Sequence, residues 1–243
     1  SKSVNELVIQ EKELLDKKSR VLENKGVRKS FEKAITRIEE IQREPKFPYS
    51  SGAREYQIDA YESWLRNGRK GIFAMATGTG KTITSLNCVL EEVKKNPDKI
   101  YHVLILVPTI TLVNQWEKEV LSFNFQEVFK ISSRVDWQNT VTTLISTSKK
   151  IPISFVLIST YASFVKDKFQ NLIKDLPDDT IFIADEGHNL ASPMVAIRIK
   201  DFKLKKRIGL SATPKRIYDP EGTAEMEVFF GEKEPYTYSF SME

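Results

Sequence analysis

The sequence predicts a doubly wound α/β fold, in which helices cover both faces of a parallel sheet. Almost unbroken apolar runs, typical of parallel strands buried on both faces, occupy residues 71–76, 103–107, 155–158, 181–184 and 207–210. Amphipathic helical patterns follow the first three runs. Strands that alternate with helices imply right-handed crossovers, so the runs should form one sheet.

Composition describes an ordinary globular protein. The chain has 243 residues, of which 40% are hydrophobic and 29% are charged, so it can bury a sizeable core. The single cysteine, Cys88, cannot form an internal disulfide, and no apolar run approaches the roughly 18 residues of a membrane span. A cytoplasmic protein with no membrane partner is expected. The net charge of +4 is too small to indicate a polyanionic partner by itself.

The first residues carry two helical patterns. Ser3 and Glu6 have the spacing of a capping box, which predicts that a helix begins there. Apolar residues then recur every seven positions, and this stripe ends near residues 24–26. A second apolar stripe runs towards Pro45, which cannot continue a helix.

Together the two stripes predict an N-terminal helical hairpin over residues 1–46. A structural hairpin or linker is favoured, and a coiled-coil or partner-docking arm is the alternative. Residues 44–52 contain two prolines and mark the boundary to the main domain, which is expected to occupy residues 53–243.

A glycine-rich loop directly follows the first predicted strand and opens a helix, as a phosphate-binding P-loop requires. Gly78 and Gly80 permit backbone conformations that a Cβ would prevent, so consecutive N–H groups can point at phosphate oxygens. Lys81 supplies a cation for the β- and γ-phosphates, and Thr82 offers a hydroxyl to Mg²⁺. The loop is expected to bind a nucleoside triphosphate through Thr77, Gly78, Thr79, Gly80, Lys81 and Thr82.

The loop departs from the strict P-loop pattern at one position. Met75 stands where that pattern begins with glycine. A dinucleotide-binding loop would need glycine at the position of Ile83, so a Rossmann-type cofactor is disfavoured. The P-loop interpretation therefore depends on a second half of the site further along the chain.

That second half is acidic. Asp185 and Glu186 directly follow the apolar run 181–184, which places two carboxylates at the carboxyl end of a strand, where the P-loop should also open. Asp185 is predicted to hold Mg²⁺ through its water shell. Glu186 is predicted to orient or deprotonate the water that attacks the γ-phosphate, a role usually worth about 10² to 10⁴ in rate. His188 follows in the same segment.

With Lys81, Asp185, Glu186 and His188 in this order, residues 53–243 resemble the first RecA-like motor domain of the DExH-box members of helicase superfamily 2. The resemblance implies a RecA-like fold, ATP and Mg²⁺ as cofactors, and a catalytic group formed by these four residues. It also implies that the chain is the ATP-binding lobe of a helicase or translocase. The Asp-Glu-Gly-His and Ser-Ala-Thr-Pro-Lys-Arg segments are similar to those of restriction and repair motors, which favours DNA over RNA.

Three further segments resemble family motifs that contact nucleotide and nucleic acid. Arg54 and Gln57 are similar to the Q motif, in which Gln57 would read the adenine edge. Pro108 and Thr109 resemble motif Ia, and Thr160 lies in a segment like the later strand-binding motif. In the family, such threonines hold phosphates of one strand. As an alternative, Thr109 and Thr160 could be helix N-caps only.

A fourth segment, Ser211, Ala212 and Thr213, is similar to the motif that couples the nucleotide state to the grip on nucleic acid. Trp116 is expected in the core of an amphipathic helix, whereas Trp137 could be a surface turn residue or a packing anchor. The basic run 198–207 is expected to be a solvated helix face or strand approach rather than a contact with nucleic acid.

A late aromatic segment with Phe229, Phe230, Tyr236 and Tyr238 resembles the link that leads into a second motor domain. No second P-loop-like lobe follows in these 243 residues, and the family places its arginine fingers on that lobe. Because an arginine finger supplies about 10³ to 10⁵ in rate, the lobe alone is expected to hydrolyse ATP poorly. The alternative function is a P-loop ATPase switch for assembly or signalling that binds no strand.

Overall fold

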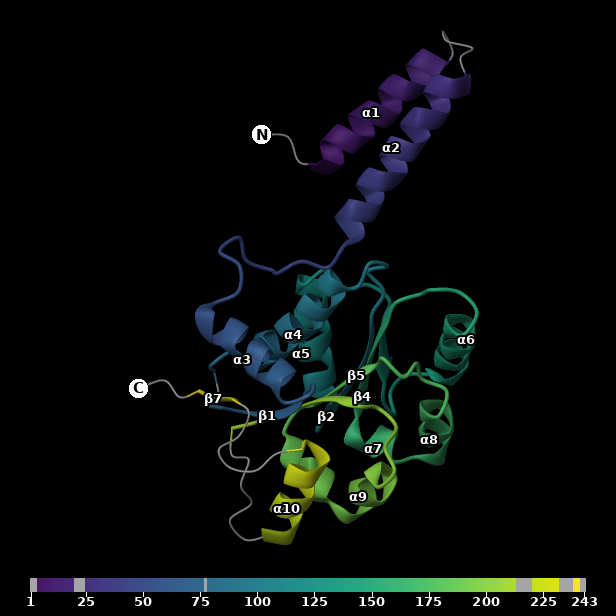
Figure 1. Ribbon diagram of the computed structural model, residues 1–243. Coiled ribbons are helices and arrows are strands. Elements are labelled where there is room, and N and C mark those ends of the chain that lie inside the picture. The colour runs from purple at the N-terminus through teal and green to yellow at the C-terminus, as the bar shows by residue number, and fades with distance from the viewer. Residues whose placement is uncertain (1–3, 20–24, 77, 213–219, 232–237, 241–243) are drawn as a thin grey trace. The chain divides into compact units, whose positions relative to one another are not determined.

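The computed structural model describes residues 4–19, 25–76, 78–212, 220–231 and 238–240 (Figure 1). The chain divides into two compact units, Ser1–Glu44 and Pro45–Glu243. Among the described helices, none is long and apolar enough to cross a membrane.

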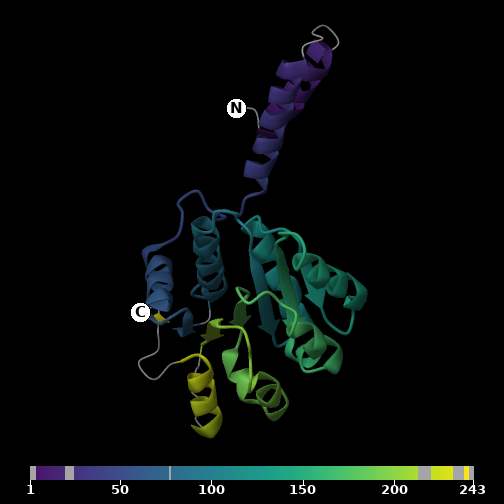
Figure 2. The same ribbon diagram turned by 45° about the vertical axis from the view of Figure 1, so that its right-hand side comes forward.

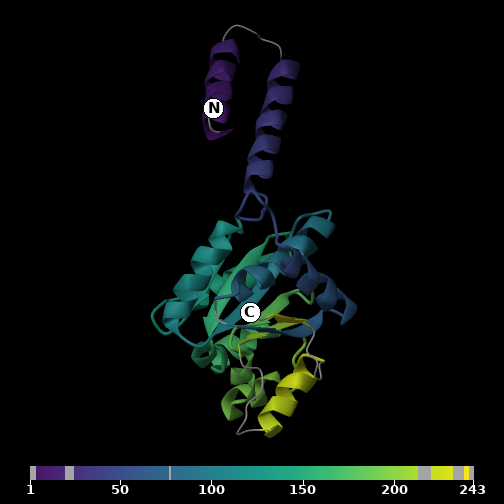
Figure 3. The same cartoon turned by 90° about the vertical axis from the view of Figure 1, so that its left-hand side faces the viewer.

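The first unit consists of two antiparallel helices, α1 (Val4–Ser19) and α2 (Lys25–Arg43), seen side by side in Figures 1 and 3. An ion pair between Lys12 and Glu39 joins them. α2 ends two residues before Pro45, as predicted, because proline lacks the N–H that the helix needs.

The boundary between the two helices was expected near residues 24–26. Lys25 and Gly26 belong to α2, so these two residues do not mark it, and residues 20–24 lie outside the described residues. Ser3, where the capping box was predicted, lies outside the described residues.

The second unit contains a parallel sheet of seven described strands in the order β3-β4-β2-β5-β6-β1-β7. They are β1 (Lys70–Met75), β2 (His102–Val107), β3 (Val128–Ile131), β4 (Phe155–Thr160), β5 (Ile181–Ala184), β6 (Lys206–Ser211) and β7 (Tyr238–Phe240). Five of these strands coincide with the apolar runs of the sequence to within two residues. The predicted α/β fold is therefore confirmed.

Helices cover both faces of this sheet (Figure 2). One apolar core joins the sheet to α3 (Glu55–Arg66), α4 (Lys81–Lys95) and α5 (Ile110–Ser122). The core on the other face includes α6 (Gln138–Ser148), α7 (Tyr161–Phe164), α8 (Asp167–Ile173), α9 (Pro193–Ile199) and α10 (Pro220–Phe229). Trp137 lies half-buried before α6, with its ring 5.7 Å from that of Phe169, so it is a packing anchor.

The two edge strands were not predicted. β3 is only partly buried, and Lys130 interrupts its apolar residues. β7 is three residues long and pairs with β1, so Tyr238 lies opposite Phe73 in the sheet. Phe230, at the end of α10, is fully buried in the core. The described part of the late aromatic segment therefore belongs to this domain rather than to a link, and Tyr236 lies outside the described residues.

The basic run 198–207 is largely engaged in contacts within the domain. Arg198 pairs with Asp167 at 2.7 Å, and Lys203 pairs with Asp178 at 3.1 Å. Arg207 is 8% exposed, which the expectation of a solvated face did not foresee. Its guanidinium donates to three main-chain carbonyls, those of Phe202, Leu204 and Phe229.

Candidate nucleotide-binding site

The order of the strands brings the predicted site residues to one edge of the sheet. Because the described strands are parallel, their carboxyl ends meet there. The glycine-rich loop follows β1, Asp185 follows β5, and β6, which ends at Ser211, lies between these two strands. On the other side of β5, β2 leads into Pro108 and β4 ends at Thr160.

Two glycines give the loop after β1 its shape. Gly78 has a φ of 82° and Gly80 a φ of 79°, both in the left-handed region that favours glycine. A Cβ on Gly80 would also lie 3.3 Å from the hydroxyl of Tyr56, which donates to the carbonyl of Thr79 at 3.1 Å. The Thr79 hydroxyl donates to the carbonyl of Ala76 at 2.6 Å. α4 begins directly after Gly80, and Thr77 lies outside the described residues.

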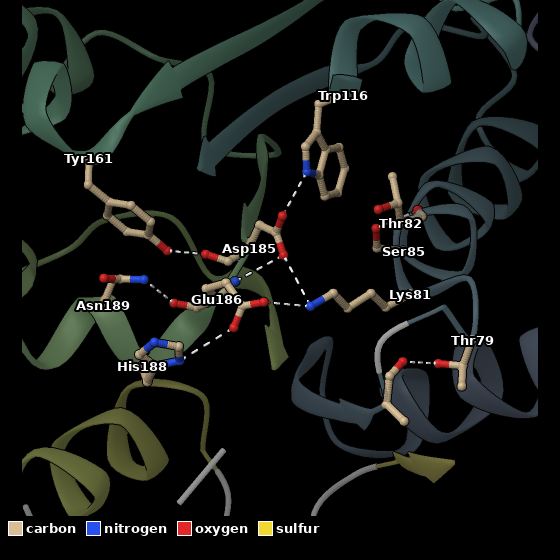
Figure 4. A network of polar contacts seen from close by, with 11 residues as sticks. Thr79, Lys81, Thr82, Ser85, Trp116, Tyr161, Asp185, Glu186, His188 and Asn189 are labelled. Carbon is tan, nitrogen blue, oxygen red and sulfur yellow. Dashed lines mark hydrogen bonds and ion pairs between the residues drawn. The ribbon is translucent and has the colours of Figure 1, made fainter. Parts of the chain in front are cut away.

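Lys81 reaches the acidic pair across the edge of the sheet (Figure 4). Its Nζ lies 2.7 Å from Glu186 Oε1 and 3.8 Å from Asp185 Oδ1. The Lys81 side chain is 16% exposed, so water screens these contacts only in part. The structure thus brings together three of the predicted catalytic residues from two distant segments.

The backbone at Glu186 is unusual for a residue with a side chain. Its φ of 47° and ψ of 59° lie in the left-handed region, which is uncommon for non-glycine residues. The Asn189 amide donates to the Glu186 carbonyl at 2.9 Å and supports this turn. Backbone strain of this kind gathers at functional sites. No signal in the sequence predicted it.

Asp185 is held by more partners than the sequence indicated. The side chain is buried, and its Oδ2 accepts from the indole N–H of Trp116 at 2.9 Å, while Oδ1 accepts from the main-chain N–H of Glu186 at 3.0 Å. The Tyr161 hydroxyl donates to the Asp185 carbonyl at 2.7 Å. Burial raises the pKa of Asp185 above its ordinary value, against the bond from Trp116 and the charge of Lys81.

Trp116 is therefore both the core residue that the pattern predicted and a polar partner of the site. It is 2% exposed on α5. Its position on the apolar face of that helix gave a signal for burial but none for the direction of its N–H. Burial, and the charges of Asp185 and Glu186, raise the pKa of Tyr161 well above its ordinary value, so its hydroxyl remains a donor.

The remaining predicted residues of this edge differ in their surroundings. His188 Nδ1 lies 3.6 Å from Glu186 Oε2, which is too long for a hydrogen bond. Ser211 is fully buried, and within the described residues its hydroxyl has no hydrogen-bond partner. Ala212 follows half-buried at the same edge, and Thr213 lies outside the described residues.

The Q-motif residues lie beside the loop, and Gln57 is bonded to its neighbours there. It is 3% exposed, its Oε1 accepts from the Arg54 N–H at 2.9 Å, and its Nε2 lies 3.4 Å from the Tyr56 hydroxyl. Gln57 therefore caps α3. Both residues line a cavity of about 910 Å³ that also includes Phe47, Tyr49, Gly78 and Ile83.

The candidate strand contacts are N-caps, as the structural alternative predicted. The Thr109 hydroxyl accepts from the Leu112 N–H at 3.2 Å at the start of α5. Thr160 accepts from the Ser163 N–H at 3.1 Å at the start of α7. Thr109 is exposed, whereas Thr160 is only 5% exposed.

The chemistry of this edge fits Mg²⁺ bound with a triphosphate. Within the part of the chain that the structure describes, no cluster of three acidic, histidine or cysteine side chains could hold a metal. Mg²⁺ suits such a site because it retains waters and takes one or two carboxylates together with phosphate oxygens. Asp185 and the hydroxyl of Thr82 are available for this purpose, and Lys81 and the N–H groups at the start of α4 can face phosphates.

Comparisons with known proteins agree with this geometry. DNA 3'-5' translocase XPB2 from Sulfurisphaera tokodaii is 29% identical over 163 residues, which are 67% of this chain and 31% of that protein. The ATP-dependent Type ISP restriction-modification enzyme LlaBIII bound to DNA is 25% identical with a TM-score of 0.53, over 67% of this chain and 13% of that one. This chain thus spans less than a third of either relative.

A nuclease-deletion mutant of the Type ISP restriction-modification enzyme LlaGI, in complex with a DNA substrate mimic, has the same fold. It aligns with a TM-score of 0.58 and 23% identity over 78% of this chain and 20% of that one. Residues 50–216, most of the chain, match the family described as ResIII, Type III restriction enzyme, res subunit. The chain therefore belongs to the ResIII family, and its sheet is that of a first RecA-like motor domain of helicase superfamily 2.

Proposed function

We propose that this chain is the ATP-binding and ATP-hydrolysing lobe of a DNA translocase or helicase from a restriction or repair system. One observation carries the proposal. Lys81, at the start of the helix after a glycine-rich loop, lies 2.7 Å from Glu186, which is 105 positions further along the chain. A cation and an acidic pair that meet in this way at the carboxyl edge of a sheet suit a metal-bound triphosphate.

Different residues of the chain would bind the phosphates, hold Mg²⁺ and accept the proton. Lys81 would pair with the β- and γ-phosphates, and the N–H groups at the start of α4 would surround them. Mg²⁺, held by Thr82 and through water by Asp185, would offset the charge of the phosphates. Glu186 Oε1 would accept a proton from the attacking water.

In this structure the ion pair with Lys81 occupies Glu186 Oε1, the oxygen that would face the attacking water. A triphosphate would draw Lys81 towards its phosphates and leave Glu186 Oε1 open to that water.

DNA as the nucleic-acid partner is supported by the relatives. XPB2 is named a DNA translocase, and the LlaBIII structure contains DNA. In this chain, Pro108 and Thr109 would contact a strand at the start of α5, where Thr109 is exposed. Contact through Thr160, which is 5% exposed, would require the corner between β4 and α7 to open.

A second RecA-like lobe would complete the motor. This chain covers 31% of the length of XPB2, which leaves room for such a lobe in that relative. Residues 1–243, measured apart from such a lobe and its arginine finger, are expected to bind MgATP weakly and to hydrolyse it about 10³- to 10⁵-fold more slowly than a complete motor. A cytoplasmic location is consistent with the single cysteine, Cys88, which is buried and unpaired.

Replacement of Lys81 tests the nucleotide site. In Lys81→Ala, the affinity for MgATP, measured by calorimetry, should fall at least about tenfold, since hydrogen bonds to charged groups are worth about 1.5–3 kcal/mol. Lys94→Ala is the matched control, because Lys94 lies exposed in the last turn of the same helix. Equal affinities of the two variants, with intact folds by circular dichroism, would contradict the proposal.

A titration with nucleic acid separates the motor from an ATPase switch that binds no strand. Fluorescence anisotropy with single-stranded and duplex DNA and RNA, repeated at several salt concentrations, should show DNA binding that weakens as salt rises. Thr109→Ala should weaken that binding. If the chain binds MgATP and none of these nucleic acids, the switch is the better interpretation.

A further inference from the structure

Two aromatic side chains from different elements converge on Asp185 (Figure 4). Trp116 approaches from α5 and bonds the carboxylate, whereas Tyr161 approaches from the start of α7 and bonds the main-chain carbonyl. Both side chains are buried, at 2% and 7% exposure. Burial of the apolar rings alone does not require the indole N–H and the hydroxyl, so these polar groups call for an explanation of their own.

The bond from Trp116 gives the two oxygens of the Asp185 carboxylate different surroundings. Oδ2 is tied to the indole N–H, and Oδ1 faces the loop, where it accepts from the Glu186 N–H and lies 3.8 Å from Lys81 Nζ. Because Trp116 on α5 bonds Oδ2 and Tyr161 bonds the main-chain carbonyl of Asp185, the carboxylate has little freedom to rotate. The oxygen that it presents to the loop is therefore determined by Trp116.

α5 also carries the candidate strand contact. Thr109 caps its first turn, and Trp116 lies seven residues later, which is about two helical turns or about 10 Å along the axis. Strand β2, which leads into Thr109, is the direct neighbour of β5, which leads into Asp185. A shift of α5 at its first turn would therefore move the indole and, through its N–H, the carboxylate.

We propose that Trp116 and Tyr161 are positioning residues for Asp185, and that α5 transmits nucleic-acid contact at Pro108 and Thr109 to the metal-binding carboxylate through the Trp116 N–H. This inference rests on the proposed function. Linkage requires that the coupling be reciprocal, so that bound DNA changes the Mg²⁺ dependence of nucleotide binding and bound Mg²⁺ with ATP changes the affinity for DNA.

The test compares Trp116→Phe with Trp64→Phe on the whole chain. Trp64 is a matched control, because it is fully buried and its indole N–H donates to a main-chain carbonyl, that of Arg207, at 2.9 Å. Binding of mant-ATP is followed by anisotropy while Mg²⁺ is varied, with and without a short duplex DNA. Thermal melting of each variant without nucleotide reports its fold.

The Mg²⁺ midpoint is the Mg²⁺ concentration that gives half of the Mg²⁺-dependent rise in mant-ATP binding. In Trp116→Phe it should rise about tenfold, as expected for loss of a hydrogen bond to a charged group. Binding of mant-ATP in EDTA should stay within about twofold of the unmodified chain, because Lys81 and the loop are intact. Duplex DNA should shift the Mg²⁺ midpoint of the unmodified chain and of Trp64→Phe, and leave that of Trp116→Phe unchanged.

A Mg²⁺ midpoint in Trp116→Phe equal to that of the unmodified chain would overturn the inference. So would a rise of the midpoint in Trp64→Phe, without DNA, as large as the rise in Trp116→Phe. If Trp116→Phe does not fold, Tyr161→Phe decides, because it removes a single oxygen, and an unchanged midpoint there would also overturn the inference. Failure of the unmodified chain to bind mant-ATP would instead refute the proposed function, and the inference with it.

Discussion

A methyl group added at Gly209 should destabilise the fold through a single contact. Gly209 lies in β6, and a Cβ built on it would meet two ring carbons of Phe230 at 2.7 Å and a third at 3.1 Å. Phe230 is fully buried against Phe229, with ring centroids 5.0 Å apart, so it has no free space to enter. Overpacking of this kind costs about 1–3 kcal/mol.

Thermal unfolding of Gly209→Ala, followed by circular dichroism, measures this cost. For a domain of this size, 1 kcal/mol lowers the melting temperature by about 2–4 °C, so a fall of about 2–12 °C is expected. Gly187→Ala is the control: its Cβ would meet neighbours at 3.6–3.7 Å, including the same ring, and its melting temperature should change little.

A double-mutant cycle identifies the ring as the cause. In the Phe230→Leu background the ring atoms are gone, so Gly209→Ala should cost less than about 0.5 kcal/mol, which gives a coupling of at least about 0.5 kcal/mol. The reasoning would be refuted if Gly209→Ala had the melting temperature of the unmodified chain. It would also be refuted if Gly209→Ala cost as much stability in the Phe230→Leu background as in the unmodified chain.

Three further predictions concern buried charges. Asp185→Asn should abolish Mg²⁺-dependent ATP hydrolysis, because it removes the negative charge that would hold the ion; hydrolysis at the unmodified rate would count against this. Because burial raises the pKa of Asp185 above its ordinary 3.8, the folded chain binds more protons than the unfolded chain between these two pKa values. The unmodified chain should thus lose stability relative to Asp185→Asn as pH rises through that window, as urea melts at a series of pH values would show. Arg207→Lys should lose about 2–3 kcal/mol in urea unfolding, because one ammonium group cannot reach all three carbonyls that the guanidinium binds; an unchanged midpoint would contradict this.

Much of the fold could be predicted because it depends on short-range patterns. A strand buried on both faces needs apolar residues throughout, and this condition alone located β1, β2, β4, β5 and β6. β3 and β7 escaped prediction because edge strands need fewer apolar residues, and only pairing with a neighbour defines them. Helix α6 also follows no strong pattern, since Thr142, Thr143 and Ser146 interrupt its apolar residues.

The site was predictable in its residue types and less so in its contacts. Lys81, Asp185 and Glu186 could be placed together because a P-loop and the carboxyl ends of parallel strands share one edge. The cap formed by Gln57 and the bond from Trp116 depend on side-chain direction, which is set by packing across the core rather than by local spacing. The left-handed backbone of Glu186 likewise reflects the surrounding turn.

The short strand β7 has a consequence for any shortened form of this protein. It covers β1 only from Phe73 to Met75, the half that leads into the glycine-rich loop. A chain cut before Tyr238 would leave the N–H and C=O groups of that half open to solvent, beside the loop that is expected to hold phosphates. Bare strand edges invite pairing between molecules. Truncated preparations should therefore self-associate through β1, and their loss of nucleotide binding would then report aggregation rather than a missing catalytic group.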